Sequence, residues 1–426
     1  MRVLAITQGS RGDIEPFSAL AHELIKRGHE IALVGPASQL DLARHFGATC
    51  FPTIDPVPRL VADPEIRQSI QQGCHGPRGF RLRYRTMRVA RVAMTPMLRD
   101  ILEAACIYRP NIIVHHIKLP GNQIGEFLDV PSIPVCFDPS YIPTNSFPSP
   151  RFGLPAPRFL NRLTYVSAQY LIRGYISGVP QWRERDLGLR PRRGHLNVLR
   201  NPDGSPTVTF QAISKHILQH PLDYPGWVHT TGFWYAPQQE SRSLPEDLVR
   251  FIDSGPPPVY IGFGSLSGTD PYRAGSEVRE AVKRARVRAV VAAGWGGIRI
   301  SDRDEQIYCI TGAPHSALFP RMSAIVHHGG SGTTAAALAS GRPQVVCPFY
   351  ADQPYYASRM HQCGVAVKPL HQRSLNASGL SDAIRSVVDN LALERRAFEL
   401  AERVRNEGGV AYSVDALESV VEHWKT

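Results

Sequence analysis

Apolar and polar positions follow two different spacings over the start of the chain. Apolar runs at 3–6 and 30–34 have the length of buried strands, and a glycine-containing turn at 9–12 follows the first run. Between the runs, apolar residues recur at near-helical spacing, with Pro16 in the first turn and Gly28 where a left-handed residue can end a helix. This pattern predicts a β-α-β unit with two parallel strands.

The same alternation recurs along the rest of the chain. Further apolar runs of strand length are 112–114, 132–137, 258–264, 289–293, 324–327 and 343–347. Helical patterns separate these runs, and strands that alternate with helices predict mainly parallel, doubly wound sheets. The fold class that we expect is therefore α/β, with two Rossmann-like doubly wound domains.

A polar stretch at 236–241 divides the strand candidates into two series. We expect a domain over 1–235, a linker at 236–245, a second domain over 246–411, and a helix over 412–426 that packs back on the first domain. At roughly 100 to 200 residues per domain, two domains suit the length of the chain. A cleft between two such domains is the usual place for a site.

Composition narrows the possible function classes. A hydrophobic fraction of 43% is typical of a globular protein. No run of about 18 consecutive apolar residues occurs, and the first residues lack a cleavable signal pattern, so we expect a cytoplasmic protein without a membrane span. The seven cysteines are scattered and have no metal-ligand spacing, which predicts reduced thiols and no zinc site.

Part of the net charge of +11 is local. Seven arginines alternate with apolar residues in a helical pattern; they are Arg78, Arg81, Arg83, Arg85, Arg88, Arg91 and Arg99. The simplest interpretation is a solvated helix face. The alternative is a basic amphipathic surface that meets lipid or an amphiphilic acceptor, which would place the protein at the inner face of the membrane. Nucleic acid is not expected as a partner, because no recognised nucleic-acid-binding module accompanies the charge.

The segment 326–338 carries the most informative pattern in the chain. An apolar strand runs into a glycine-rich turn, which opens a helix of good helix formers and so presents backbone N–H groups at a positive helix end. The turn residues are His328, Gly329, Gly330, Ser331, Gly332 and Thr333. Glycines allow close backbone approach, and the hydroxyls and the imidazole can donate hydrogen bonds to phosphate oxygens. The segment predicts a diphosphate site.

Two further strand-end positions carry acidic side chains. Asp352 and Gln353 stand side by side after the run at 343–347, and such a pair suits recognition of sugar hydroxyls, although an Asp in this position is by itself more often a helix cap or turn residue. Asp13 follows the first turn, and its position alone favours a role in the first turn of a helix. It also stands at the sheet edge where a general base would have to lie.

Dinucleotide and metal sites are disfavoured. The turn at 9–12 does not match the G-x-G-x-x-G fingerprint, and the turn at 262–268 reaches its third glycine one residue late, so NAD is not expected. Asp302 and Asp304 resemble paired metal ligands, but they stand in a charged run that is typical of a solvated loop.

Taken together, these motifs resemble the nucleotide-sugar-dependent glycosyltransferases of GT-B fold, the UDP-glycosyltransferase family. The nearer resemblance is to its bacterial branch, which acts on glycopeptide antibiotics, macrolides, sterols and mycobacterial glycopeptidolipids. The resemblance rests on the segments 9–16, 262–265, 313–320, 327–334 and 348–353, which occur in the order and at the spacing of the family. It implies two Rossmann-like domains that face a central cleft, the first for acceptor and the second for donor.

The resemblance also implies roles for single residues. The donor-binding residues would be Ser10, Ser265, Pro314, His315, His328, Gly330, Ser331, Gly332, Thr333, Asp352 and Gln353. Within that set, the turn at 328–333 would hold the diphosphate, Pro314 and His315 the base, and Asp352 and Gln353 the sugar. No metal or cofactor is implied; the substrate would be a UDP- or dTDP-linked sugar, and the helix after the turn would stabilise the leaving diphosphate.

Asp13 is the catalytic base that the resemblance implies, where many members have a histidine. It would take a proton from an acceptor hydroxyl as that oxygen attacks the anomeric carbon and inverts its configuration. Phe147, Phe152, Phe159 and Tyr165 indicate that the acceptor is partly apolar. Two alternatives stay open: a GT-B auxiliary protein without turnover, and a nucleotide-sugar epimerase.

Overall fold

The computed structural model divides into two compact units. The first comprises Met1–Ala236 and Glu407–Thr426, and the second comprises Pro237–Asn406. The structure describes residues 1–9, 11–54, 94–152, 156–176, 178–219, 221–237, 244–264, 270–293, 298–300, 304–349 and 352–424. Six of the seven arginines in the basic segment, all except Arg99, lie outside these residues, as do Ser10 and Ser265.

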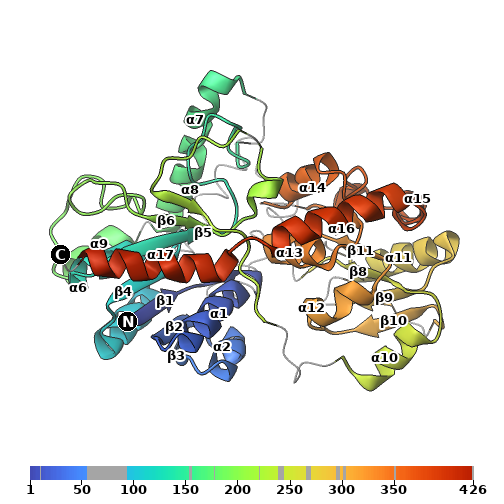
Figure 1. Ribbon diagram of the computed structural model, residues 1–426, viewed down its shortest axis with the longest axis horizontal. Coiled ribbons are helices and arrows are strands. Elements are labelled where there is room, and N and C mark those ends of the chain that lie inside the picture. Colours follow the sequence, from blue (N-terminus) through green and yellow to red (C-terminus); the bar gives the residue numbers. More distant parts are fainter. Residues whose placement is uncertain are drawn as a thin grey trace. The chain divides into compact units, whose positions relative to one another are not determined.

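The first unit is built on a seven-stranded parallel sheet with the order β3-β2-β1-β4-β5-β6-β7 (Figure 1). Its strands are β1 (Arg2–Ile6), β2 (Glu30–Pro36), β3 (Thr49–Thr53), β4 (Ile112–His116), β5 (Ser132–Cys136), β6 (Thr209–Gln211) and β7 (Val228–Thr230). Its helices are α1 (Arg11–Lys26), α2 (Asp41–His45), a helix over 94–108, α6 (Gly121–Leu128), α7 (Asn161–Thr164), α8 (Val166–Tyr175), α9 (Val179–Arg185) and α17 (Gly409–Trp424).

Alternate residues of β1 enter two cores, because successive side chains of a strand point to opposite faces of the sheet. Val3 and Ala5 pack into the core that α1 and α17 cover, with Phe17 and Leu417 among its buried residues. Leu4 and Ile6 enter the core on the other face, under the helix over 94–108 and α6. Helices thus cover both faces, which explains why the central strands are continuous apolar runs.

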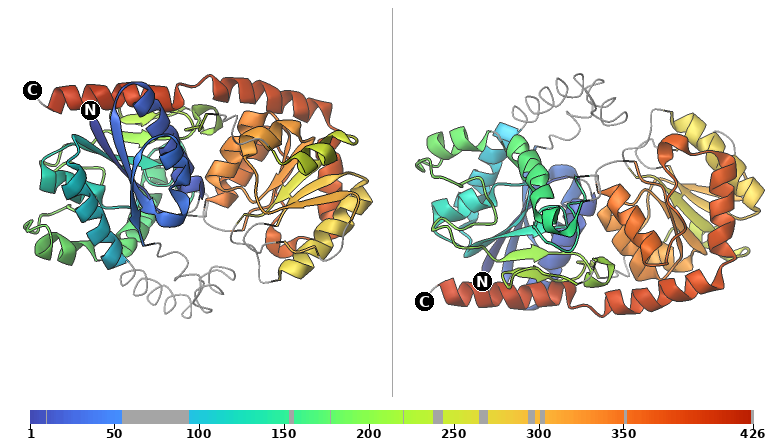
Figure 2. Two further views of the ribbon diagram at one scale, coloured as in Figure 1. Left: turned by 90° about the horizontal axis from the view of Figure 1, so that it is seen from below. Right: turned by 90° about the horizontal axis from the view of Figure 1, so that it is seen from above.

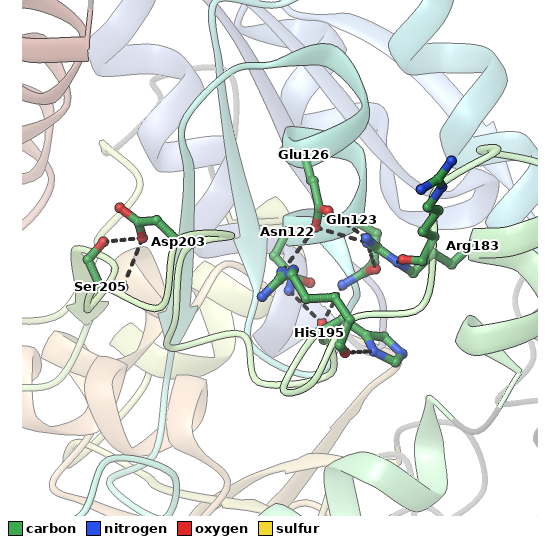
Figure 3. Close-up of polar contacts among 9 residues, drawn as sticks. Asn122, Gln123, Glu126, Arg183, His195, Asp203 and Ser205 are labelled. Carbon is green, nitrogen blue, oxygen red and sulfur yellow. Dashed lines mark hydrogen bonds and ion pairs between the residues drawn. The ribbon is translucent and has the colours of Figure 1, made fainter.

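Ion pairs and hydrogen bonds connect the outer helices of this unit to one another. Arg183 on α9 is 2% exposed and pairs with Glu126 on α6 at 2.5 Å, and it donates to Gln123 at 2.8 Å (Figure 3). The Gln123 amide in turn donates to the His195 carbonyl at 2.5 Å, which ties the loop after α9 to the same network. At the C-terminal helix, His29 contacts Glu418 of α17 at 2.7 Å. The helix α17 runs beside α1 of the same unit (Figure 2).

The second unit has a five-stranded parallel sheet with the order β10-β9-β8-β11-β12. Its strands are β8 (Val259–Gly262), β9 (Ala289–Ala292), β10 (Ile307–Ile310), β11 (Ala324–His327) and β12 (Gln344–Val346). Its helices are α10 (Glu246–Asp253), α11 (Pro271–Ala285), α12 (His315–Leu318), α13 (Ser331–Ser340), α14 (Gln353–Gln362), α15 (Ala377–Val388) and α16 (Leu391–Arg405). Two cores again cover the two faces, so the expected α/β class with doubly wound sheets is confirmed.

Strand order determines where each unit can form a site. The order reverses between β1 and β4 in the first sheet and between β8 and β11 in the second. The chain leaves the carboxyl ends of such strands in opposite directions, and this divergence opens a crevice in doubly wound folds. Asp13 follows β1, His116 ends β4, and the turn at 328–330 follows β11.

Among the described residues, no helix is long and apolar enough to cross a membrane.

Candidate functional site

The glycine turn at 328–330 joins β11 to α13 at the switch point of the second sheet. Gly330 is the N-cap residue of α13, and its carbonyl accepts the Thr334 N–H at 2.9 Å to close the first helical turn. Because glycine has no capping side chain, the first N–H groups of α13 keep their capacity to bind an anion. Gly329 has a φ of 85°, and a Cβ there would lie 2.8 Å from Val346 Cγ1.

The two adjacent histidines have different roles in this turn. His327 is fully buried; its Nδ1 accepts the Gly329 N–H at 3.1 Å, and its Nε2 contacts Gln344 Oε1 at 3.0 Å. This ring therefore fixes the shape of the turn. Burial lowers the pKa of His327 to about 3, so the imidazole is neutral at pH 7.

His328 occupies the space that two glycines leave. A Cβ on Gly264, after β8, would lie 2.9 Å from its Cε1, so a side chain there would displace the imidazole, and Gly330 is similarly tight against its Nε2. Its Nδ1 has no hydrogen-bond partner among the described residues. Burial lowers the pKa of His328 to about 4. A neutral imidazole held between two glycine turns can donate one hydrogen bond to a ligand oxygen at the end of α13.

The remaining donor-side candidates follow other strands of the same sheet. Pro314 is the N-cap residue of α12, and the His315 ring stacks on Phe319 with centroids 4.3 Å apart. Asp352 is the N-cap residue of α14 without a side-chain capping bond. Gln353 is only 7% exposed, and its Oε1 accepts the Phe349 N–H at 2.8 Å, so this oxygen braces the preceding loop.

Asp13 lies in the first turn of α1, directly after β1. Its carbonyl accepts the Thr7 hydroxyl at 2.9 Å, and its side chain is 28% exposed. The carboxylate folds back over Gly9, which has a φ of 124°, and a Cβ on Gly9 would overlap Asp13 Oδ2. Only glycine therefore leaves room for this carboxylate position.

His116, at the end of β4, is the partner that the sequence did not reveal. Its Nε2 lies 3.6 Å from Asp13 Oδ1, and its Nδ1 accepts the Lys118 N–H at 3.1 Å. The Nδ1 contact leaves the ring proton on Nε2, facing the carboxylate. Burial lowers the pKa of His116, so the ring is neutral. The sequence pattern ended this strand at Val114, two residues before the histidine that lies next to Asp13.

Further charged groups lie near the Asp13 carboxylate. Asp138, after β5, is buried and lies 3.4 Å from Arg151. Burial alone would raise the pKa of Asp138, but Arg151 and Lys118 hold it below its usual value. The pKa of Lys118 is raised in spite of burial, because Tyr141 and Asp13 face its ammonium group. Acidic and basic groups thus balance at the carboxyl edge of the first sheet.

Known protein families match both ends of the chain. Residues 3–50 match the N-terminal domain of glycosyltransferase family 28, and residues 299–414 match the C-terminal domain of erythromycin biosynthesis protein CIII-like proteins. Sterol 3-beta-glucosyltransferase UGT80A2 of Arabidopsis thaliana is 29% identical over 98% of this chain, and a sterol 3-beta-glucosyltransferase of Neosartorya fischeri is 30% identical over 100% of this chain. The chain spans 65% of the first relative and 30% of the second, less than two thirds of either.

Solved structures share the fold. Glycosyltransferase VinC, solved in complex with dTDP, superposes with a TM-score of 0.68 at 17% identity, covering 99% of this chain and all of VinC. The glycosyltransferase of kitacinnamycin gives a TM-score of 0.69 at 17% identity and covers 98% of both chains. The two family matches and the relatives aligned along the whole chain show that this protein is similar to glycosyltransferases, and the solved structures show that it shares their GT-B fold.

Proposed function

We propose that the protein is an inverting glycosyltransferase. It moves a hexose or deoxyhexose from a UDP- or dTDP-linked donor to a hydroxyl group of a partly apolar acceptor. The observation that carries this proposal is the turn at 328–330, where a neutral imidazole and the uncapped end of α13 meet at the switch point of the second sheet. Two relatives are named for glucosyl transfer to sterols, which favours an apolar acceptor.

In this mechanism the second unit holds the donor. The N–H groups of Ser331, Gly332 and Thr333 and the imidazole of His328 donate hydrogen bonds to the diphosphate oxygens. The negative charge that develops on the leaving diphosphate is stabilised by these preorganised donors and by the dipole of α13. Pro314 and His315 contact the base.

Asp352 and Gln353 bind the sugar hydroxyls in the same mechanism. Because Gln353 Oε1 already accepts the Phe349 N–H, Gln353 contributes its amide N–H groups and Asp352 supplies the acceptor oxygens.

The first unit binds the acceptor, and Asp13 is the base. As the acceptor oxygen forms its bond to the anomeric carbon, the bond from that carbon to the diphosphate oxygen breaks, and the hydroxyl proton passes to Asp13. The products are the inverted glycoside and a nucleoside diphosphate. His116 is a positioning residue: its Nε2–H faces the carboxylate and holds it above the end of β1.

A thermal shift experiment tests the donor site. UDP or dTDP at about 100 times its dissociation constant should stabilise the protein by about 2.7 kcal/mol, and His328→Ala should remove that stabilisation because it deletes a phosphate donor. His371→Ala is the matched control, since His371 is an exposed histidine of the same unit. Stabilisation by NAD alone, or an undiminished shift in His328→Ala, would contradict the proposed site. Product analysis with the responding nucleotide sugar must then give a glycoside of inverted configuration.

The basic segment 78–99 forms a second part of the proposal. If it forms the amphipathic surface that the sequence permits, it would bring the protein to the inner face of a membrane. Most of this segment lies outside the described residues, so the structure adds no support to it.

A further inference from the structure

Exposed apolar side chains gather at one place in the first unit. Five of the thirteen large apolar side chains that are exposed among the described residues lie between 152 and 166. They are Phe152 (41%), Phe159 (79%), Leu160 (37%), Leu163 (65%) and Val166 (45%). Four of the five follow one another through the short helical turn 158–160, α7 and the start of α8, a region that projects beyond β5 and β6 in Figure 1. We call the exposed side chains of 158–166 the outer face.

This segment buries polar side chains as well as Tyr165, while several large apolar side chains stay exposed. The buried positions between the exposed apolar ones include Asn161 (3% exposed) and Thr164 (5%). Asn161 donates to the Asn145 carbonyl at 2.8 Å, and the Thr164 hydroxyl accepts the Ser149 N–H at 2.7 Å. Both polar side chains thus form a hydrogen bond inside, although Asn161 Oδ1 has no hydrogen-bond partner among the described residues. Phe159 and Leu163, four residues apart, face outward. Exposed apolar side chains that gather in one segment in this way indicate an interaction surface.

Charge indicates the partner. Residues 139–183 contain five arginines, of which Arg151 pairs with Asp138 and the buried Arg183 pairs with Glu126. Two of the arginines, Arg158 and Arg162, are exposed on the outer face itself. Apolar side chains with a rim of arginine match the two layers of a membrane surface, where acyl chains lie beneath negatively charged headgroups.

We propose that the outer face, Arg158 to Val166, docks on an anionic lipid bilayer. Phe159, Leu163 and Val166 enter the headgroup–acyl boundary, and Arg158 and Arg162 contact the lipid phosphates. The surface belongs to described residues and is distinct from the segment 78–99. The proposal does not depend on the transferase activity, since docking requires neither donor nor acceptor.

Vesicle co-sedimentation tests the docking. The probes are vesicles of equal parts phosphatidylcholine and phosphatidylglycerol, with pure phosphatidylcholine vesicles as the uncharged comparison. The protein should sediment with the first and much less with the second. Phe159→Ser with Leu163→Ser should lower binding at least about tenfold, because each removes most of a buried side chain from the acyl boundary. Arg158→Gln with Arg162→Gln should weaken binding at low salt, and the difference from the unchanged protein should vanish at about 1 M salt, where the Debye length is about 3 Å.

Matched controls separate docking from general surface effects. Leu391→Ser removes a side chain that is also 79% exposed, and Arg395→Gln removes an arginine whose side chain is 82% exposed, both on α16 of the second unit. Neither should change vesicle binding, and every variant should keep the unfolding temperature of the unchanged protein.

Several results would overturn the proposal. One is absence of binding to anionic vesicles at low salt, and another is equal binding by the double serine variant and Leu391→Ser. If light scattering shows a concentration-dependent dimer that Phe159→Ser with Leu163→Ser abolishes, the outer face joins two copies of the chain and the lipid proposal is wrong. Loss of lipid binding leaves the nucleotide thermal shift untouched, so the two proposals fail independently.

Discussion

The contact between Asp13 and His116 makes a sharp prediction about turnover. His116→Leu removes the Nε2–H that faces the carboxylate but keeps an apolar side chain of similar volume against Phe137, whose ring centroid lies 5.6 Å from the imidazole. A hydrogen bond to a charged group contributes about 1.5–3 kcal/mol. The separation of 3.6 Å is beyond hydrogen-bond distance in this structure; because catalytic contacts often tighten when substrate binds, we take the lower end of that range for the substrate complex. This corresponds to about a tenfold loss of kcat.

A double-mutant cycle decides whether His116 acts through Asp13. Asp13→Asn should lower kcat by roughly 10²–10⁴. Adding His116→Leu to Asp13→Asn should cost little more, because the group that His116 positions has then lost its function. His116→Gln should restore most of the activity, since its amide nitrogen can replace Nε2–H. KM for the nucleotide sugar should stay unchanged in all these variants.

The assay is initial-rate release of nucleoside diphosphate, with thermal unfolding as a check that each variant is folded. A further tenfold loss when His116→Leu is added to Asp13→Asn would refute the argument, because the two side chains would then act independently. Failure of His116→Gln to restore kcat would refute the assigned proton on Nε2.

Two further predictions concern stability. Gly329→Ala should lower the free energy of unfolding by more than Gly341→Ala, a matched glycine with a φ of 68°. The strain of positive φ costs about 1–2 kcal/mol at both positions, but a Cβ at 329 would lie 2.8 Å from Val346 Cγ1, whereas the atom nearest to a Cβ at 341 would be 3.4 Å away. Equal losses in urea unfolding would contradict the packing argument. Lowering the pH from 7 to 5 should destabilise the protein, because folding lowers the pKa values of His327 and His328 to about 3 and about 4. Below the pKa of about 6.5 that a histidine has in the unfolded chain, the unfolded state binds more protons than the folded state, which costs about 2 kcal/mol per histidine at pH 5. A urea midpoint that stays constant between these pH values would show that the imidazoles are not buried and neutral.

Local patterns determined much of the fold. Apolar runs separated by helical spacing predicted the α/β class, because strands buried on both faces need continuous apolar residues and their crossovers need helices. The strand at 324–327 and the helix after the glycine turn were predicted closely, since a strand, a turn and a helix that adjoin in sequence also adjoin in space. The short strands β6 and β7 have three residues each and no distinctive pattern, and the sequence did not reveal them.

Contacts between distant segments were decided only by the tertiary structure. His116 lies beside Asp13 because β4 pairs with β1, and strand pairing has no signal within a single segment. The amide oxygen of Gln353 is taken by Phe349 through the bend of a loop, which the residue types do not specify.

The aromatic residues show most clearly what the sequence determined and what only the tertiary structure decided. The sequence grouped Phe147, Phe152, Phe159 and Tyr165 as one apolar set. The structure buries Phe147 and Tyr165 to 2% and 1% exposure and turns Phe159 outward at 79%. The sequence by itself determined which segments form strands, helices and glycine turns, because those choices depend on neighbours along the chain. Packing alone decided which side of a short helical segment faces the core, and therefore which of its residues can meet a partner.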